Sequence, residues 1–246
     1  MLGPLAIVAA VYVLVHVLPA GQEASESSLS PDTIAMATFD TMTRLAIAYV
    51  LAIACAVPLA ISATMNRTTE AILLPIFDIL ESVPILALFP VVIMVFVNYF
   101  HSLDGAAVFI LFMTMLWNIV FPLIGGLQII PGDVIAAAKV FGVEGFAFVR
   151  RVLLPALVPQ MVTGSILAMA QGWNIIIVAE VLHTYIPGGT SAQDLFGIGS
   201  ILVDASANAQ NGVFLEAVFA LVVVIGLLNL LVWQRLLHIS QRFRFE

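Results

Sequence analysis

The chain has 246 residues, of which 62% are hydrophobic and 9% are charged, and its mean hydropathy is +1.15. This balance is typical of a membrane protein rather than a soluble domain, and the length allows about six spans of roughly 20 residues. The formal net charge of −7 argues against a nucleic-acid partner, and the single cysteine, Cys55, excludes a disulfide or a thiolate metal cluster within one chain.

The first apolar run covers Leu5–Leu18 and stops at Pro19 and Gly21. It lacks the basic n-region and the A-x-A-type cleavage site of a signal peptide, so we interpret it as a first span at about residues 2–20. A cytoplasmic N-terminus normally carries Lys or Arg. The absence of that flank is typical of a chain cut from a longer polypeptide.

An acidic, Ser-rich connector follows, and we interpret Thr33–Arg44 as an interfacial helix. Three prolines kink the third span, which membrane helices tolerate when neighbours satisfy the freed carbonyls. A polar, Gly-rich segment at 183–212 is long for a plain loop, so we expect it to pack back into the protein on the outer side. The remaining spans are predicted at about residues 43–62, 71–97, 105–127, 161–182 and 213–234.

The basic residues orient the spans. When six spans are threaded alternately, only Arg44 falls on the side opposite the other basic residues. The positive-inside rule then makes the majority side cytoplasmic, with both termini and the loop at 128–160 inside. The residues on the cytoplasmic side are Arg67, Lys139, Arg150, Arg151, Arg235, Arg242 and Arg244.

That cytoplasmic loop contains a short predicted helix at 133–142. Asp133 occupies the position of an N-cap, where its carboxylate accepts from free backbone N–H groups, and Gly142 supplies the left-handed residue that ends a helix. Roughly nine residues make about 13 Å of helix, which is too short to span a bilayer. The helix has the right size to lie across the membrane surface and bind a partner.

The chain shows no pattern of an enzyme. Lys139 is its only lysine and is followed by Val140, whereas a phosphate-binding P-loop requires Gly-Lys-Ser/Thr. The glycines of Gly197-Ile-Gly199 follow no predicted strand, so they do not form a dinucleotide loop. The four histidines are scattered, and no Ser or Cys has a base in the same motif. We therefore expect no catalytic residue, metal site or resident cofactor in this chain.

The loop at 128–160 resembles the "EAA" loop of ABC importer permeases, in which Glu-Ala-Ala, three residues, Gly and nine residues precede Ile-x-Leu-Pro. Ala137 and Ala138 match the alanines, Gly142 matches the glycine, and Val152 and Pro155 arrive at the required spacing. Ala136 stands where the family usually has Glu, which removes any polar contact of that Glu. Two further segments, 82–90 and 172–200, are similar to the nitrate/sulfonate/taurine branch. The segment at 172–200 is most similar to anion permeases with two such halves in one polypeptide, and a natural single-half permease is the alternative.

The resemblance implies an all-α membrane protein of the type I ABC importer permease fold, with one multi-pass domain over 1–246 in the cell membrane. It implies a second permease half (identical, homologous or fused), an extracytoplasmic solute-binding protein, and ATPase subunits that carry ATP and Mg²⁺. The implied solute is a small anion such as nitrate, a sulfonate, taurine or bicarbonate, and a vitamin precursor is the alternative. The implied ATPase-coupling residues are Asp133, Ala136, Ala137, Ala138, Lys139, Val140, Phe141, Gly142 and Pro155.

Polar side chains within the spans are candidates for the translocation pathway, because a charge at mid-bilayer costs about 2.5–3.5 kcal/mol. For Asp78 and Glu81 we favour bracing of the proline kink, and for Glu180 pairing with Arg44 or helix capping is the alternative. We expect no buried basic residue, so solute selection would rest on the binding protein. The candidates are Asp78, Glu81, Trp117, Asn118, Gln171, Trp173, Asn174 and Glu180.

Two other classes compete with the ABC permease. A secondary transporter or channel without ATP would need inverted repeats or a charged relay through the spans, and neither is visible. A membrane scaffold protein would not need a short cytoplasmic helix with this spacing.

Overall fold

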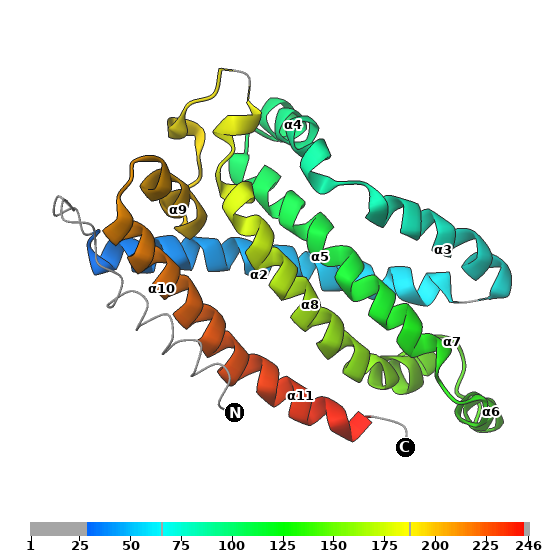
Figure 1. The fold of residues 1–246 in the computed structure, drawn as a ribbon. Helices are drawn as coiled ribbons and strands as arrows, with labels where there is room; N and C mark the ends of the chain where they lie inside the picture. Colours follow the sequence, from blue (N-terminus) through cyan, green and yellow to red (C-terminus); the bar gives the residue numbers. More distant parts are fainter. Residues whose placement is uncertain (1–28, 65, 187, 244–246) are drawn as a thin grey trace. The chain divides into compact units, whose positions relative to one another are not determined.

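The structure is a computed structural model that describes residues 29–243, except residues 65 and 187. The described residues contain helices and no strand, which confirms the prediction of an all-α protein. In chain order the elements are α2 (Pro31–Ala63), α3 (Arg67–Ser82), α4 (Ile85–Val95), η1 (Phe96–Phe100), α5 (Leu103–Gln128), α6 (Gly132–Val140), α7 (Gly145–Phe148), η2 (Val149–Leu153), α8 (Leu154–Glu180), η3 (His183–Tyr185), η4 (Ser191–Gln193), α9 (Ile198–Ala207), α10 (Asn211–Leu228), η5 (Asn229–Trp233), α11 (Gln234–Ser240) and η6 (Gln241–Phe243) (Figure 1).

Four helical segments are long and apolar enough to cross a membrane, namely Pro31–Ala63, Leu103–Gln128, Gly145–Glu180 and Asn211–Phe243. A fifth candidate is the bent pair formed by α3 and the continuous α4–η1. These five overlap the predicted spans that begin near residue 43 and beyond, although α2 starts at Pro31 and so includes the predicted interfacial helix. The predicted span at 2–20 lies outside the described residues.

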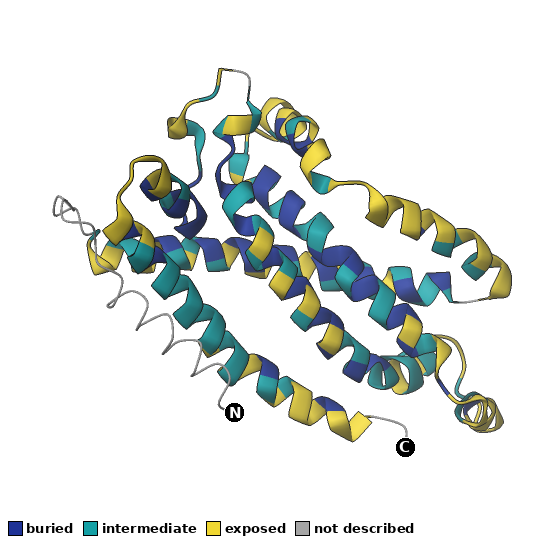
Figure 2. Ribbon diagram, in the orientation of Figure 1, coloured by how far each residue is buried: buried dark blue, intermediate teal, exposed yellow. Residues whose placement is uncertain are grey.

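The predicted proline kink is a full break between α3 and α4–η1, which meet at an angle of 84°. Val83 ends α3 in an extended conformation, with φ −71° and ψ 119°. The ring of Pro84 disfavours the helical region for the residue before it, and α3 ends there, although the helices continue through Pro75 and Pro90. Most of α3 is exposed, and Phe77 is its one buried residue (Figure 2).

The described residues divide into two compact units, and α2, α5 and α8 contribute to both. The first unit comprises residues 29–48, Leu88–Leu111 and Gly172–Gln234. Its apolar core joins α9 to α10 through Ile198, Leu202 and Ala217, and Ile34 from α2 and Ile177 from α8 pack against this core. Thus the segment expected to pack back into the protein contains a helix, α9, with a buried apolar face.

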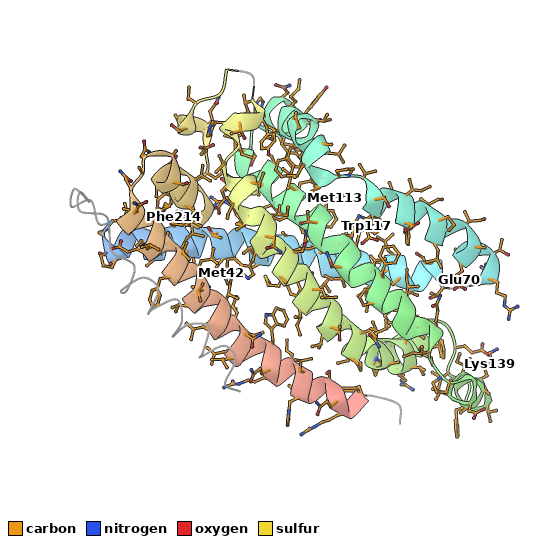
Figure 3. The ribbon with its side chains drawn as sticks, in the orientation of Figure 1. Met42, Glu70, Met113, Trp117, Lys139 and Phe214 are labelled. Carbon is orange, nitrogen blue, oxygen red and sulfur yellow. The ribbon has the colours of Figure 1, made fainter. Side chains whose placement is uncertain are left out.

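The second unit comprises Tyr49–Ala87, Phe112–Gln171 and the described chain from residue 235 onward. Here α5 and α8 approach closely. A Cβ atom on Gly164 would lie only 3.0 Å from the backbone oxygen of Asn118, so the absence of a side chain at Gly164 permits this approach. The Tyr49 hydroxyl donates to Ser165 Oγ at 2.7 Å and links α2 to α8. At the start of α3, Glu70 accepts a hydrogen bond from Gln128 Nε2 at 2.6 Å (Figure 3). Small residues and polar side-chain bonds are the usual means of helix association in membranes.

Candidate functional site

The short helix α6 begins without a side-chain cap. Pro131 is the N-cap residue, and its carbonyl accepts from the Val134 N–H at 3.0 Å. The prediction that Asp133 is the N-cap is therefore wrong, since Asp133 lies within the first turn and no side chain caps this end. The fixed φ of proline and its free carbonyl start the helix without a side-chain acceptor. The Asp133 carboxylate still lies where the helix dipole favours negative charge.

The other end of α6 forms a Schellman motif. Gly142 has φ +67°, the left-handed conformation predicted for it. The Val143 N–H donates to Ala138 O at 2.9 Å, and the Gly142 N–H donates to Lys139 O at 3.0 Å. These two hydrogen bonds satisfy carbonyls that would otherwise be free at the helix end. The end of α6 is therefore determined by Gly142 and its immediate neighbours.

At the end of α6 and just beyond it the chain presents large apolar side chains. Val140 is 84% exposed, Phe141 is 81% exposed, and Phe146 on α7 is 80% exposed. By contrast Ala138 is buried, while Lys139 is exposed on α6 (Figure 3). Exposed apolar groups grouped within a short segment are typical of a surface that another molecule covers. The other predicted coupling residues, Ala136 and Ala137, are exposed, and Pro155 is half-buried at the start of α8.

We expect Gly142→Ala to lower the thermal midpoint of the purified protein by about 2–8 °C, because a left-handed non-glycine residue costs about 1–2 kcal/mol. A Cβ atom at Gly142 meets no atom within 4 Å, so backbone strain alone acts. Gly132→Ala is the control, since Gly132 also has free space and no positive φ. Equal midpoints for the two variants would contradict the assignment.

A buried ionic cluster joins α2, α5 and α8 in the first unit. The Arg44 guanidinium donates from Nη1 to Glu180 Oε1 at 2.8 Å and from Nε to Asp104 Oδ1 at 2.7 Å. Nη1 also donates to the backbone oxygen of Phe196 at 2.9 Å. The side chain of Glu180 is 0% exposed and that of Arg44 is 10% exposed. The Asp104 carboxylate, at 64% exposed, connects the cluster to the surface.

The same carboxylate of Glu180 binds the N-terminus of α9. Glu180 Oε2 accepts from the Gly199 N–H at 2.8 Å, and Glu180 Oε1 accepts from the Thr41 hydroxyl at 2.7 Å. The Thr41 oxygen in turn accepts from the Ile198 N–H at 3.0 Å. The negative charge thus lies where the helix dipole and free N–H groups favour it. Glu180 thereby acts as a tertiary cap that holds α9 against α2 and α8.

Arg44 corrects one expectation. We expected no buried basic residue, whereas Arg44 is only 8% exposed. Two carboxylates, Glu180 and Asp104, share its one positive charge, so the cluster as a whole carries net negative charge. It therefore lacks the excess positive charge that an anion trap needs. The pairing of Glu180 with Arg44, which we kept as the alternative, is the arrangement present.

The acidic pathway candidates of the second unit, Asp78 and Glu81, are both exposed on α3. Neither carboxylate makes an ion pair or hydrogen bond with another residue in the described ranges 29–64, 66–186 and 188–243. Their lining or bracing role stays a prediction.

The aromatic candidate Trp117 is buried in the same unit. Its ring centroid lies 5.6 Å from that of Phe77 and 6.3 Å from that of Phe121. The neighbouring Asn118 donates from Nδ2 to Thr114 O at 2.9 Å, within its own helix. Both residues therefore have packing or hydrogen-bonding partners, and a pathway role for them stays a prediction.

The candidates on α8 differ in exposure. Gln171 belongs to the second unit and is half-buried, whereas Trp173 and Asn174 belong to the first unit and are half-buried and exposed, respectively. The candidates are thus distributed over both units. Among all of them, only Glu180 belongs to a dense polar network.

Sequence reasoning missed Thr41 as a partner of Glu180. The spacing of Thr41 and Arg44 could have indicated this contact, because two residues that are three apart share one face of a helix. We placed this stretch outside the second span, and α2 instead runs through it. The sequence pattern of Gly197-Ile-Gly199 predicted no structural role for its two glycines. Their role is close approach, since a Cβ atom on either would collide with the Glu180 carboxylate.

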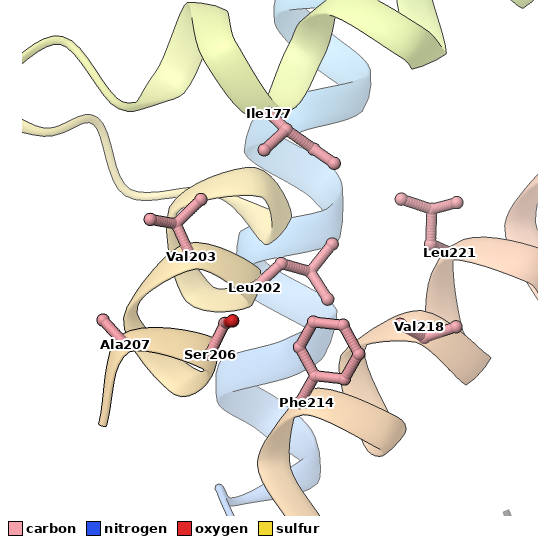
Figure 4. Close-up of a pocket in the computed structure, with 8 residues that line it drawn as sticks. All are labelled: Ile177, Leu202, Val203, Ser206, Ala207, Phe214, Val218 and Leu221. Carbon is pink, nitrogen blue, oxygen red and sulfur yellow. The ribbon is translucent and has the colours of Figure 1, made fainter. Parts of the chain in front are cut away.

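An apolar pocket of about 510 Å³ lies between α8, α9 and α10 (Figure 4). Ile177, Leu202, Phe214 and Leu221 line it, and among the described lining residues Ser206 alone has a polar side chain. A small hydrated anion needs several donors in place of its water. The described residues that line this pocket do not provide them.

The sequence of residues 49–245 matches the family described as "binding-protein-dependent transport system inner membrane component". The chain is similar to the nitrate import permease protein NrtB of Leptolyngbya laminosa, with 32% identity over 191 residues, which are 78% of this chain and 62% of the relative. It is also similar to the bicarbonate transport system permease protein CmpB of Synechococcus elongatus, with 29% identity over 79% of this chain and 64% of the relative. The taurine transport system permease protein TauC of Escherichia coli is 22% identical over 58% of this chain and 50% of the relative. The chain thus spans less than two thirds of the length of these relatives.

Proposed function

Since the chain belongs to the family of inner membrane components of binding-protein-dependent transport systems, we propose that it is the permease subunit of an ATP-driven ABC importer for a small anion. In this proposal it forms a membrane pathway with a second permease half. A separate ATPase, which carries ATP and Mg²⁺, docks on the cytoplasmic side, and an extracytoplasmic protein delivers the solute. The chain itself is not an enzyme.

The observation that carries the proposal is the capped helix α6 with its exposed apolar end. Val140 and Phe141 are more than four-fifths exposed on a segment that the positive-inside rule assigns to the cytoplasm. An apolar helix end of this kind suits insertion into a groove of a partner protein, as in helix-in-groove recognition. The Schellman motif fixes the direction in which Phe141 projects, so movement of the partner is transmitted to α6 and to the helices that follow it.

The choice of an anion rests on the relatives, which are named for nitrate, bicarbonate and taurine import. The charges of this chain bear on whether it could attract an anion directly from solution. Arg44 is the single Lys or Arg among the described residues of the first unit, and two carboxylates already bind it. Free anions are not attracted to such a surface. This supports delivery by a binding protein that selects the solute.

We expect Phe141→Asp to abolish ATP-driven solute uptake and co-purification with the ATPase, while the protein remains in the membrane. Loss of a buried Phe removes about 1.5–3 kcal/mol of binding free energy, and an unpaired carboxylate in an apolar groove adds a desolvation cost. Uptake of labelled nitrate, bicarbonate and taurine would be measured in cells that produce the complete transporter. Co-purification would be measured from solubilised membranes.

Phe141→Leu and Glu144→Gln are the matched controls, because the first keeps an apolar side chain and the second changes an exposed neighbour. Both controls should keep uptake and ATPase binding. Normal uptake by Phe141→Asp would overturn the coupling role of α6. ATP-independent uptake of the solute would overturn the ABC mechanism itself.

A further inference from the structure

Helix α3 is joined to α5 by a hydrogen bond and a ring contact, both within the second unit (Figure 3). Glu70 Oε1 accepts from Gln128 Nε2 at 2.6 Å, and the ring centroids of Phe77 and Trp117 lie 5.6 Å apart. Glu70 and Phe77 are separated by about two helical turns, and Trp117 and Gln128 by about three. Each pair therefore shares one face of its helix, and the two contacts together hold α3 antiparallel to α5.

The hydrogen bond holds α3 near its start, whereas the end of α3 lacks such an attachment. In the ranges 29–64, 66–186 and 188–243, it is the one side-chain hydrogen bond that joins α3 to another helix, and the other side-chain bonds of α3 are local. Near its C-terminus α3 exposes Ile79 and Leu80. Two residues, Val83 and Pro84, then separate it from α4 at the 84° break. A short non-helical connection of this kind allows the angle between two helices to change without loss of helical hydrogen bonds.

Gln128 also lies directly before the helix α6. It is the last residue of α5, and three residues separate it from α6. This connection is anchored, because Ile130 is buried and Pro131 is the N-cap residue of α6. Just before the connection Gly126 packs against α8, where an added Cβ atom would collide with the Gln160 side chain. The end of α5 is therefore tied to α6 along the chain and to α3 and α8 through side chains.

We propose that Glu70 and Gln128 are positioning residues that make α3 follow α6 when the ATPase moves it. The inference rests on the proposed function, in which the ATPase docks on α6. A hydrogen bond to a carboxylate is stronger than one between neutral groups, so it holds the first turn of α3 to the end of α5. Without it, the contact of Phe77 with Trp117 is left as a point about which α3 can turn. The ATPase would then move α6 without moving α3, and ATP would be hydrolysed without solute transport.

An exchange of the two side chains tests the contact. Gln128→Glu alone removes the donor and places two carboxylates against each other. Glu70→Gln combined with Gln128→Glu restores a donor and an acceptor with their places exchanged. Glu70→Gln alone is the matched control, since its amide oxygen still accepts from Gln128. Gln128 is exposed and Glu70 is half-buried, so none of these changes buries an uncompensated charge.

The complete transporter, with its ATPase and binding protein, would be placed in lipid vesicles. Uptake of labelled nitrate, bicarbonate and taurine would be measured together with ATP hydrolysis. Gln128→Glu should lower the amount of solute imported per ATP hydrolysed at least about fivefold, because loss of a hydrogen bond to a charged group shifts a two-state equilibrium by that factor or more. The exchanged pair should recover most of this ratio, and Glu70→Gln should keep it. All variants should bind the ATPase equally, since the surface of α6 is unchanged.

A distance measurement tests the movement itself. In a Cys55→Ser background, which removes the only cysteine, spin labels would be attached at Ile79→Cys on α3 and at Ile129→Cys directly after α5. Both positions are exposed. The separation of the labels should be the same in the ATP-free and ATP-bound transporter. When Gln128→Glu is added, the separation should differ between these two states.

The possible results distinguish the inference from the proposed function. Absence of ATP-driven uptake by the unmodified transporter would overturn the proposed function, and the inference with it. Normal uptake by the unmodified transporter together with an unchanged import ratio for Gln128→Glu would overturn the inference alone. Failure of the exchanged pair to recover a lowered ratio would do the same, and so would a label separation that changes with ATP in the chain that keeps Gln128.

Discussion

Glu180→Ala is expected to destabilise the protein by about 3–5 kcal/mol, because it leaves the buried Arg44 guanidinium without its buried counter-charge. It also frees the Gly199 N–H and the Thr41 hydroxyl, which both donate to this carboxylate. Each unsatisfied buried group adds a desolvation cost. The thermal midpoint of the purified chain should fall by about 10 °C, and the amount of protein in the membrane should fall with it.

Two variants separate the charge from the hydrogen bonds. Glu180→Gln keeps an oxygen that accepts from Thr41 or Gly199 but removes the charge opposite Arg44, so it should cost less than Glu180→Ala. Replacing both partners, as in Arg44→Met with Glu180→Leu, removes the uncompensated charge and should recover much of the stability. A midpoint for Glu180→Ala within about 2 °C of the unmodified protein would contradict the role assigned to the cluster.

Gly199→Ala is expected to destabilise the protein by about 2–3 kcal/mol through overpacking. Its Cβ atom would lie 2.8 Å from the Cα atom of Ile177 and 2.8 Å from Glu180 Oε2. Backbone at that distance cannot rotate away, so α9 must move off α8. Gly197→Ala should also destabilise, because its Cβ atom would collide with the Glu180 carboxylate. The thermal midpoint measures both effects.

The two glycines should respond differently to removal of the carboxylate. In a Glu180→Ala background, Gly197→Ala should cost little more, since the colliding atoms are gone, whereas Gly199→Ala should keep its clash with the backbone of Ile177. Gly212→Ala is the control, because its Cβ atom meets nothing within 4 Å. Additive effects of Gly197→Ala and Glu180→Ala would contradict the assigned close approach.

The fold class could be predicted from the sequence because a segment that spans a bilayer must be apolar over about 20 residues and must satisfy its own backbone hydrogen bonds. Long uncharged runs and proline breaks predicted the all-α class and the interruption of the third span, and Val83 before Pro84 shows the local cause of that break. The start of α2 was not predictable in the same way. Its first turns carry Asp32, Asp40 and Arg44. Charged residues of this kind favour an interfacial segment unless the fold provides partners for them, and the sequence does not show such partners. The structure supplies such partners for Arg44.

The α6 segment shows how far local rules reach. Gly142 was predictable because a left-handed helix end is a property of one residue and its immediate neighbours. The N-cap was wrongly predicted at Asp133 because the residue preferences for this position favour Asp over Pro. In the structure the helix begins after Pro131. The exposed state of Phe141 is a property of the folded chain, because the sequence pattern only placed Phe141 inside the helix predicted at 133–142, and in the structure this residue directly follows α6.

By itself the sequence determined what depends on neighbours along the chain: a membrane protein built from helices, the break at Pro84, the glycine end of α6, and membership of a permease family through motif spacing. Only the tertiary structure decided which charges meet. Glu180 and Arg44 are 136 residues apart, and Glu180 and Thr41 are 139 apart. The physical reason is that a buried charge is tolerable only beside its partner, and chain order does not encode which distant groups the packing of helices brings within about 3 Å of each other.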